Sequence, residues 1–189
     1  PELIRRGLRI TVLAVMDKGH TCQIVKELEI AGVRVDLLKP LNTEDSIRQI
    51  LEYLGQHPTQ VFVPNLNVPA YFLSKYLKAA GIPTVGILHS DDVFHHDLEE
   101  EFLFAKQGES LSACVVVSKQ QEARITQGEL EGTELVLAPY GAPVPENVCR
   151  HTQRTFRCIY VGRLSDQQKR VSDLLAGMIP IMRKISQLE

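Results

Sequence analysis

The chain of 189 residues has no apolar run that approaches the roughly 18 residues of a membrane-spanning helix, and no signal-peptide pattern opens it. It also lacks an excess of basic residues, because 21 Lys and Arg are set against 23 Asp and Glu. The resulting net charge of -2 argues against a dedicated nucleic-acid-binding protein. We therefore expect a cytoplasmic protein, and peripheral attachment to the inner face of a membrane stays open as an alternative.

Cysteine is scarce and irregularly spaced. The four cysteines, Cys22, Cys114, Cys149 and Cys158, include no Cys-x-x-Cys pair. Zinc sites and disulfide frameworks both use characteristic spacings, so reduced thiols are the expected state. Hydrophobic residues make up 44% of the chain and charged residues 23%, which supplies enough apolar material for a packed core.

Short apolar segments alternate with segments of helical periodicity over the first 142 residues. Strands alternating with helices indicate right-handed βαβ units and a parallel sheet that is covered on both faces. We therefore predict an α/β fold with a doubly wound, Rossmann-like parallel sheet. The predicted strands are 8–15, 33–38, 61–63, 84–88, 113–117 and 135–138; the predicted helices are an opening helix up to Arg5, then 20–31, a helix from a Thr43 cap to Gly55, one through Pro69 to Ala80, 97–106, and one from a Ser118 cap to Ile125.

Ligands of doubly wound sheets bind beyond the carboxyl ends of the strands. That rule selects five short segments: Met16-Asp17, Pro64-Asn65, His89-Ser90-Asp91, Ser118 and Tyr140-Gly141. Ser118 with Gln121 forms a capping box, so we interpret Ser118 as a structural residue.

The alternation breaks after residue 142. Residues 143–155 combine prolines with basic residues, as an interdomain linker does. A predicted strand over 156–161 and a helix from Val171 then begin a second domain over 156–189. Pro180 is expected to kink that helix or split it near Gly177.

The segment Tyr160 to Lys169 has the order of strand, glycine, polar loop and helix. The predicted strand ends at Gly162, and Arg163 and Lys169 bracket the loop. A helix start supplies unpaired N–H groups, and two cations supply full charge, so this segment suits an anionic phosphate group. A solvated basic loop is the alternative.

This segment resembles the start of the nucleotide-sugar domain in retaining family 4 glycosyltransferases of the GT-B architecture. In that family a strand ending in Gly-Arg is followed by a Lys, and the Arg and Lys grip the donor diphosphate. Arg163 and Lys169 stand at that spacing, and Ser172-Asp173-Leu174-Leu175 continues as the family does. The chain departs from the family at Arg170, where a Gly is frequent.

The resemblance extends back to the stretch from Val85 to Asp92, where an apolar strand ends in His89. The family places such a His against the transferred sugar, which implies a catalytic role for His89. A His that caps a turn is the alternative from the residues alone. The resemblance assigns cleft-lining positions only weakly, and those are Asn65, Asp91, Tyr140 and Gly141, with Tyr140 where the family more often has Asn.

The resemblance implies a hexosyltransferase-type enzyme that moves a sugar from a nucleotide-diphosphate donor to a hydroxyl acceptor with retention. The acceptor would be a glycan or a lipid-linked sugar, in carbohydrate or cell-surface polysaccharide biosynthesis, and neither cofactor nor metal is implied. The family's opening glycine-rich loop and its later pair of glutamates are absent from these residues. We therefore expect a fragment, most of an acceptor domain (1–142) with the first βα unit of a second Rossmann-like domain, and little activity from it alone.

Two other functions stay open. One is a non-catalytic domain that binds a sugar nucleotide or a partner. The other is a metal-dependent hydrolase using His89 and Asp91, because His and Asp are metal ligands and six of them lie within nine positions from 89 to 97. Their spacing matches no defined metal motif, and Asp91-Asp92 is not the Asp-x-Asp of metal-dependent glycosyltransferases.

Overall fold

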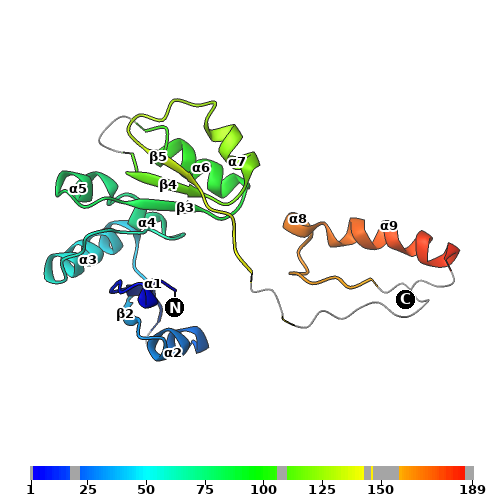
Figure 1. Ribbon diagram of the computed structural model, residues 1–189, viewed down its shortest axis with the longest axis horizontal. Coiled ribbons are helices and arrows are strands. Elements are labelled where there is room, and N and C mark those ends of the chain that lie inside the picture. Colours follow the sequence, from blue (N-terminus) through cyan, green and yellow to red (C-terminus); the bar gives the residue numbers. More distant parts are fainter. Residues whose placement is uncertain (1, 18–21, 106–109, 143–145, 147–157, 186–189) are drawn as a thin grey trace. The chain divides into compact units, whose positions relative to one another are not determined.

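The structure is a computed structural model that describes residues 2–17, 22–105, 110–142, 146 and 158–185 (Figure 1). The chain divides into two compact units, Pro1–Gly141 and Ala142–Glu189. Parallel strands alternate with helices in the first unit, which confirms the predicted α/β class. The strands form two small sheets in place of the single doubly wound sheet that we expected.

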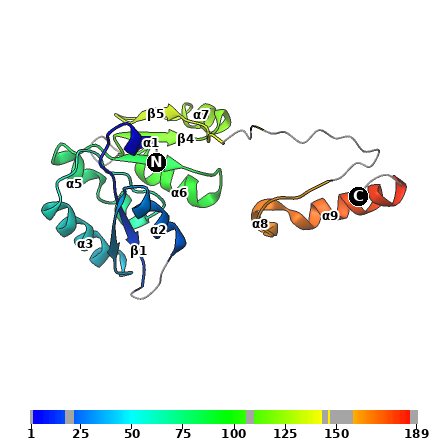
Figure 2. The same cartoon turned by 60° about the horizontal axis from the view of Figure 1, so that its bottom comes forward.

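The first sheet has two parallel strands, and α2 lies alongside it (Figure 2). Thr11 pairs with Arg34 at one end of the register and Val15 with Leu38 at the other. The elements of this part are α1 (Glu2–Arg5), β1 (Thr11–Val15), α2 (Gln23–Ile30) and β2 (Arg34–Leu38), so the predicted order is confirmed with shorter elements.

The next helix, α3 (Thr43–Gln56), begins and ends differently from the prediction. Its cap is Asn42, whose side-chain oxygen accepts a hydrogen bond of 3.0 Å from the Asp45 amide. Asn is a stronger N-cap than Thr, so the helix takes Thr43 as its first residue. Gly55 lies inside the helix and does not end it.

The second sheet has the parallel order β3-β4-β5, formed by β3 (Val85–Leu88), β4 (Ala113–Val116) and β5 (Glu134–Leu137). The strand predicted over 61–63 is reduced to one bridge between Phe62 and Thr84. Phe62 donates to the Pro83 carbonyl and accepts from the Val85 amide. Pro64 follows and has no N–H to donate, so pairing stops there.

Within the described residues, the helices of this part of the chain lie before β3 and between the strands. The predicted helix through Pro69 to Ala80 is two helices, α4 (Val68–Tyr71) and α5 (Ser74–Ala79). Helix α6 (Val93–Phe102) begins four residues before the predicted start, because the Asp92 carboxylate accepts from the His95 amide and caps it there. Helix α7 (Lys119–Ile125) and its Ser118 cap are as predicted.

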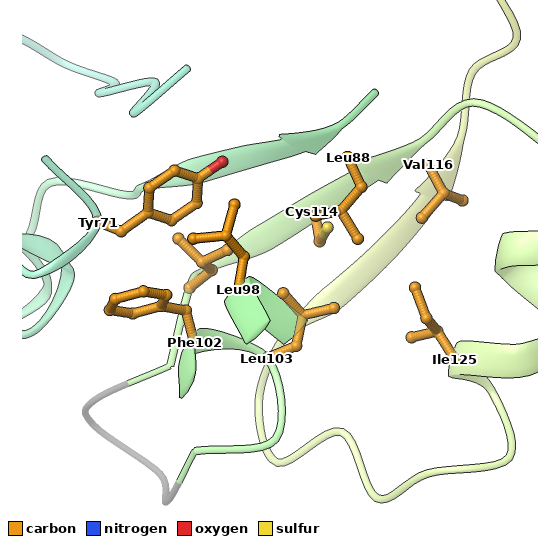
Figure 3. Close-up of a cluster of buried hydrophobic side chains, with 9 residues drawn as sticks. Tyr71, Leu88, Leu98, Phe102, Leu103, Cys114, Val116 and Ile125 are labelled. Carbon is orange, nitrogen blue, oxygen red and sulfur yellow. The ribbon is translucent and has the colours of Figure 1, made fainter. Parts of the chain in front are cut away.

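The core of the first unit packs helices against the second sheet, as Figure 3 shows. The ring of Phe102 on α6 lies between Tyr71 and Phe72, with ring centroids 5.2 and 5.0 Å away. Leu88, the last residue of β3, belongs to the same cluster and is 1% exposed. The cluster comprises Tyr71, Leu88, Leu98, Phe102, Leu103, Leu111, Cys114, Val116 and Ile125, and a second cluster comprises Leu38, Ile50, Ala70, Leu73 and Leu77.

The second unit contains α8 (Asp166–Lys169) and α9 (Val171–Lys184). The described part of the predicted strand, Cys158–Val161, is not a strand. A strand needs a hydrogen-bonded neighbour, and the Val161 side chain is 89% exposed. Helix α9 runs through Pro180 without the predicted split. The predicted linker 143–155, Glu146 apart, lies outside the described residues.

Within the described ranges, no helix combines the length and the apolar composition that crossing a membrane requires.

Candidate functional site

His89 lies directly after β3 and bonds to two of the predicted rim residues. Its Nε2 is 2.5 Å from Oδ1 of Asn65, and its Nδ1 is hydrogen-bonded to the hydroxyl of Tyr140. The rings of His89 and Tyr140 are nearly parallel, with an interplanar angle of 5° and centroids 6.0 Å apart. These three residues form the candidate site at the end of β3. In the sequence, Asn65 is 24 positions from His89 and Tyr140 is 51 positions from it.

His89 and Tyr140 follow strands β3 and β5 of the second sheet, and Asn65 comes three residues after the bridge between Phe62 and Thr84. His89 follows Leu88, which is 1% exposed and fixed in the core. Asn65 follows the Phe62 bridge, in a turn where its amide donates to the Val63 carbonyl at 2.9 Å. Tyr140 comes after β5, whose pairing continues to Ala138. This convergence is what the parallel topology requires of strand ends.

The two hydrogen bonds indicate the protonation of His89. An amide oxygen only accepts, so this contact is a hydrogen bond when Nε2 of His89 carries the proton and donates to Oδ1 of Asn65. Nδ1 is then the acceptor, and the Tyr140 hydroxyl donates to it. Burial lowers the pKa of His89, and the nearby His95 lowers it further. The imidazole is therefore neutral, with one polarised N–H at the edge of the site.

The loop after His89 is held by helix α7. Nε2 of Gln121 donates to the Ser90 carbonyl at 2.7 Å, and Gln121 is itself buried. Asp91 accepts from Arg124 at 2.9 Å and lies 2.8 Å from Nε2 of His96. The hydrogen bond from His96, and then the charge of Arg124, hold the pKa of Asp91 below its usual range. The carboxylate of Asp91 is thus bonded to α6 and α7 residues.

A buried ion pair that the sequence did not reveal supports this loop. Glu99 on α6 is 1% exposed, and Arg124 donates two hydrogen bonds to it, of 2.5 and 2.7 Å. The hydrogen bonding of Arg124 to the Glu99 carboxylate raises the pKa of Arg124. Glu99 belongs to the run Glu99 to Glu101, which reads as a solvated face. The sequence signal for the burial of Glu99 was its spacing. It stands three residues before the apolar Phe102, which puts Glu99 and Phe102 on one face of α6.

Four residues of the metal alternative form two pairs, Asp91 with His96 and Asp92 with His95. Asp92 lies 2.7 Å from Nδ1 of His95, and that contact lowers the pKa of Asp92. Nε2 of His95 is buried and has no hydrogen-bond partner. Across the described part of the chain, no group of three His, Cys, Asp or Glu side chains is arranged to hold a metal ion.

The other predicted rim positions contribute less. Met16 and Asp17 line a shallow hollow with Val15 and Pro40 at the end of β1. Gly141 is exposed, and a Cβ added there would meet no atom within 4 Å, so no close approach requires a glycine. Ser118 acts as the helix cap already described.

The predicted diphosphate-binding residues lie in the second unit. Tyr160 folds back over Gly162 and donates to the Arg163 carbonyl at 2.8 Å. A Cβ on Gly162 would meet the Tyr160 hydroxyl at 2.8 Å, so the glycine permits this contact. The side chains of Arg163 and of Lys169, the last residue of α8, are exposed.

The start of α9 differs from the expectation of free N–H groups. The Ser172 amide donates to Asp166 at 2.7 Å, and the Ser172 hydroxyl donates to the same carboxylate at 2.5 Å. These two bonds lower the pKa of Asp166. A carboxylate of this chain therefore occupies a position that we expected a phosphate to take. Arg170 precedes α9 with φ +49° and pairs with Asp173.

Comparisons of this chain with protein-family models, with curated proteins and with solved structures find no match.

Proposed function

We propose that this chain contributes to a retaining glycosyltransferase that moves a sugar from a nucleotide-diphosphate donor to a hydroxyl acceptor. The observation that carries the proposal is the group at the end of β3. A neutral His89 with Asn65 and Tyr140 offers donors and acceptors on a rigid edge, which is what binding a sugar hydroxyl requires.

The backbone at Arg170 supports the proposal independently. Arg170 adopts φ +49° and ψ +45°, a left-handed conformation that glycine takes without steric cost. The glycosyltransferases that this segment resembles often have Gly at this position. The geometry of the loop thus fits the residue preference of that family, although this chain places an arginine there.

In the proposed reaction, Arg163 and Lys169 stabilise the negative charge that develops on the leaving diphosphate. His89 orients the sugar through its ring N–H. Because the Ser172 N–H already donates to the Asp166 carboxylate, the diphosphate is held by the cationic side chains and not by that N–H. The mechanism needs neither a strong protein base nor a metal ion, and the acceptor is a glycan or a lipid-linked sugar.

Binding of nucleoside diphosphates tests the proposal. We would titrate the chain with UDP, GDP and ADP by calorimetry, and repeat the titration with Arg163→Ala and Lys169→Ala. Each substitution removes one charge-assisted contact and is expected to weaken binding by about tenfold. Lys184→Ala at the end of α9, an exposed cation of the same unit, is the matched control. Equal affinity of all three variants would overturn the diphosphate assignment.

Release of UDP or GDP from a panel of nucleotide sugars measures transfer itself. His89→Ala should reduce release if His89 orients the sugar. Diphosphate binding that depends on Arg163 and Lys169, without release from any donor, would instead favour the non-catalytic sugar-nucleotide-binding domain.

A further inference from the structure

His89 has no unbonded ring nitrogen in this structure. Nδ1 bonds to Tyr140 and Nε2 bonds to Asn65. Each imidazole nitrogen makes one hydrogen bond in the ring plane, so a ligand atom reaches His89 only by replacing one of these partners. Ligand binding at His89 therefore depends on which of these two partners stays bonded to the ring and which one a ligand atom replaces.

Tyr140 is the partner with the stronger hold on the ring. Its hydrogen bond lies close to the plane of the imidazole, because the two rings are nearly parallel, at an interplanar angle of 5°, and their centroids are 6.0 Å apart, the separation of rings joined end to end through the hydroxyl. The Asn65 side chain meets the ring through one hydrogen bond, from an exposed turn. Its Oδ1 also plays the same acceptor role as the ligand expected here, since a sugar hydroxyl oxygen can accept a hydrogen bond from the same Nε2–H.

The direction of the Tyr140 bond follows from acidity. A phenol is a better hydrogen-bond donor than acceptor, and an unprotonated imidazole nitrogen is a strong acceptor. Neither bonded partner of His89 carries a charge that would hold a second proton on the ring. Donation from Tyr140 into Nδ1 therefore places the single ring proton on Nε2.

We propose that Tyr140 is a positioning residue for His89, and that its hydroxyl holds the imidazole in the Nε2–H tautomer so that a ligand oxygen can replace Oδ1 of Asn65. The identity of that oxygen as a sugar hydroxyl rests on the proposed function. The Nε2–H tautomer of His89 and its dependence on the Tyr140 hydroxyl do not rest on the proposed function.

The tautomer is observable by long-range ¹H–¹⁵N correlation spectroscopy of the full chain labelled with ¹⁵N-histidine. His89→Gln identifies the His89 signals by their loss. We expect a pyrrole-type Nε2 and a pyridine-type Nδ1 in the unsubstituted chain. Tyr140→Phe keeps the aromatic ring and removes the hydroxyl, so the His89 signals should shift toward a mixture of tautomers. Tyr76→Phe, at a tyrosine that is 51% exposed on the same unit, should leave them unchanged.

Asn65→Ala separates the two partners. If Tyr140 sets the tautomer, His89 remains Nε2–H when Asn65 is removed, with water on Nε2. A change to Nδ1–H in Asn65→Ala would assign the positioning role to Asn65 and overturn the proposal, as would an unchanged spectrum in Tyr140→Phe. These measurements need no nucleotide sugar, so a failure of the transferase or diphosphate assays leaves their outcome standing, and the reverse holds equally.

Discussion

Arg124 on α7 holds the carboxylate of Glu99 on α6 through both of its terminal nitrogens, at 2.5 and 2.7 Å. The same guanidinium reaches Asp91 at 2.9 Å, two residues after His89. Glu99 is buried, whereas the Arg124 side chain is 37% exposed. One cation thus joins two helices and the loop that carries His89.

Arg124→Met should lower the free energy of unfolding by about 3 kcal/mol. The substitution keeps an aliphatic stem but leaves the buried Glu99 carboxylate without its cation, and partial exposure of the pair sets the effect at the low end for buried ion pairs. Adding Glu99→Gln removes the stranded charge and should restore part of the loss. Urea unfolding followed by circular dichroism measures both variants.

Arg48→Met is the control for that experiment. Arg48 pairs with the exposed Glu44 and Asp45 on α3, and such surface pairs contribute under about 1 kcal/mol. An Arg124→Met variant as stable as Arg48→Met would contradict a structural role for the Glu99 pair.

Two glycines should respond to alanine in opposite directions. A Cβ on Gly86 in β3 would lie 2.5 Å from Cδ1 of Leu111, a fully buried side chain that cannot move aside freely. Gly86→Ala should therefore cost about 1–3 kcal/mol by overpacking. A Cβ on Gly55 in α3 would meet no atom within 4 Å, so Gly55→Ala should stabilise the chain by about 0.5–1 kcal/mol. A Gly86→Ala variant as stable as the unsubstituted chain in urea unfolding would contradict the close packing against Leu111, and a destabilised Gly55→Ala variant would contradict the open space at Gly55.

Leu66, next to Asn65 of the candidate site, is a strained position. Its φ of +55° lies in the left-handed region, which costs a branched residue about 1 kcal/mol or more. Its side chain is 48% exposed, so replacing it loses little burial. Leu66→Asn should raise the unfolding midpoint, because Asn tolerates this region, and Leu66→Val should lower it. A midpoint for Leu66→Val above that of Leu66→Asn would argue against the left-handed turn.

Stability should fall on mild acidification because of His89. The folded pKa of His89 lies below the ordinary value of about 6.5, chiefly through burial. The contribution of neutral His89 is complete above that value and is lost as the pH falls through the lowered pKa. Unfolding midpoints at pH 7.5, 6.5 and 5.5 should therefore decline less in His89→Gln than in the unsubstituted chain. Parallel declines would indicate that His89 does not titrate differently on folding.

The local elements of the first unit were predictable because their signals lie within a few residues. The Ser118 cap of α7 bonds to an amide three positions away, and Gly7 and Gly32, in left-handed conformations, end α1 and α2. Where local prediction failed, a neighbouring residue competed better. Asn42 displaced Thr43 as a cap, and Asp92 began α6 before the predicted residue.

The candidate site was predictable in part, by a topological rule. Strand alternation and the strand-end rule selected His89, Asn65 and Tyr140 separately. No local pattern indicated that the three bond to one another, since the partners of His89 are 24 and 51 residues away. The Glu99–Arg124 pair was missed for the same reason, with 25 residues between its members.

The sequence by itself determined the α/β class, the order of most elements and the segments from which the site is built, because periodicity, caps and glycines act over one or two turns of chain. Only the tertiary structure decided that the strands form two sheets, that Cys158–Val161 is not a strand and that Asp166 occupies the start of α9. Those outcomes depend on which hydrogen-bonding partners meet in space. The choice of Tyr140 and Asn65 as partners of His89 belongs to the same class, because side chains on separate strand ends become neighbours only when the sheet has formed.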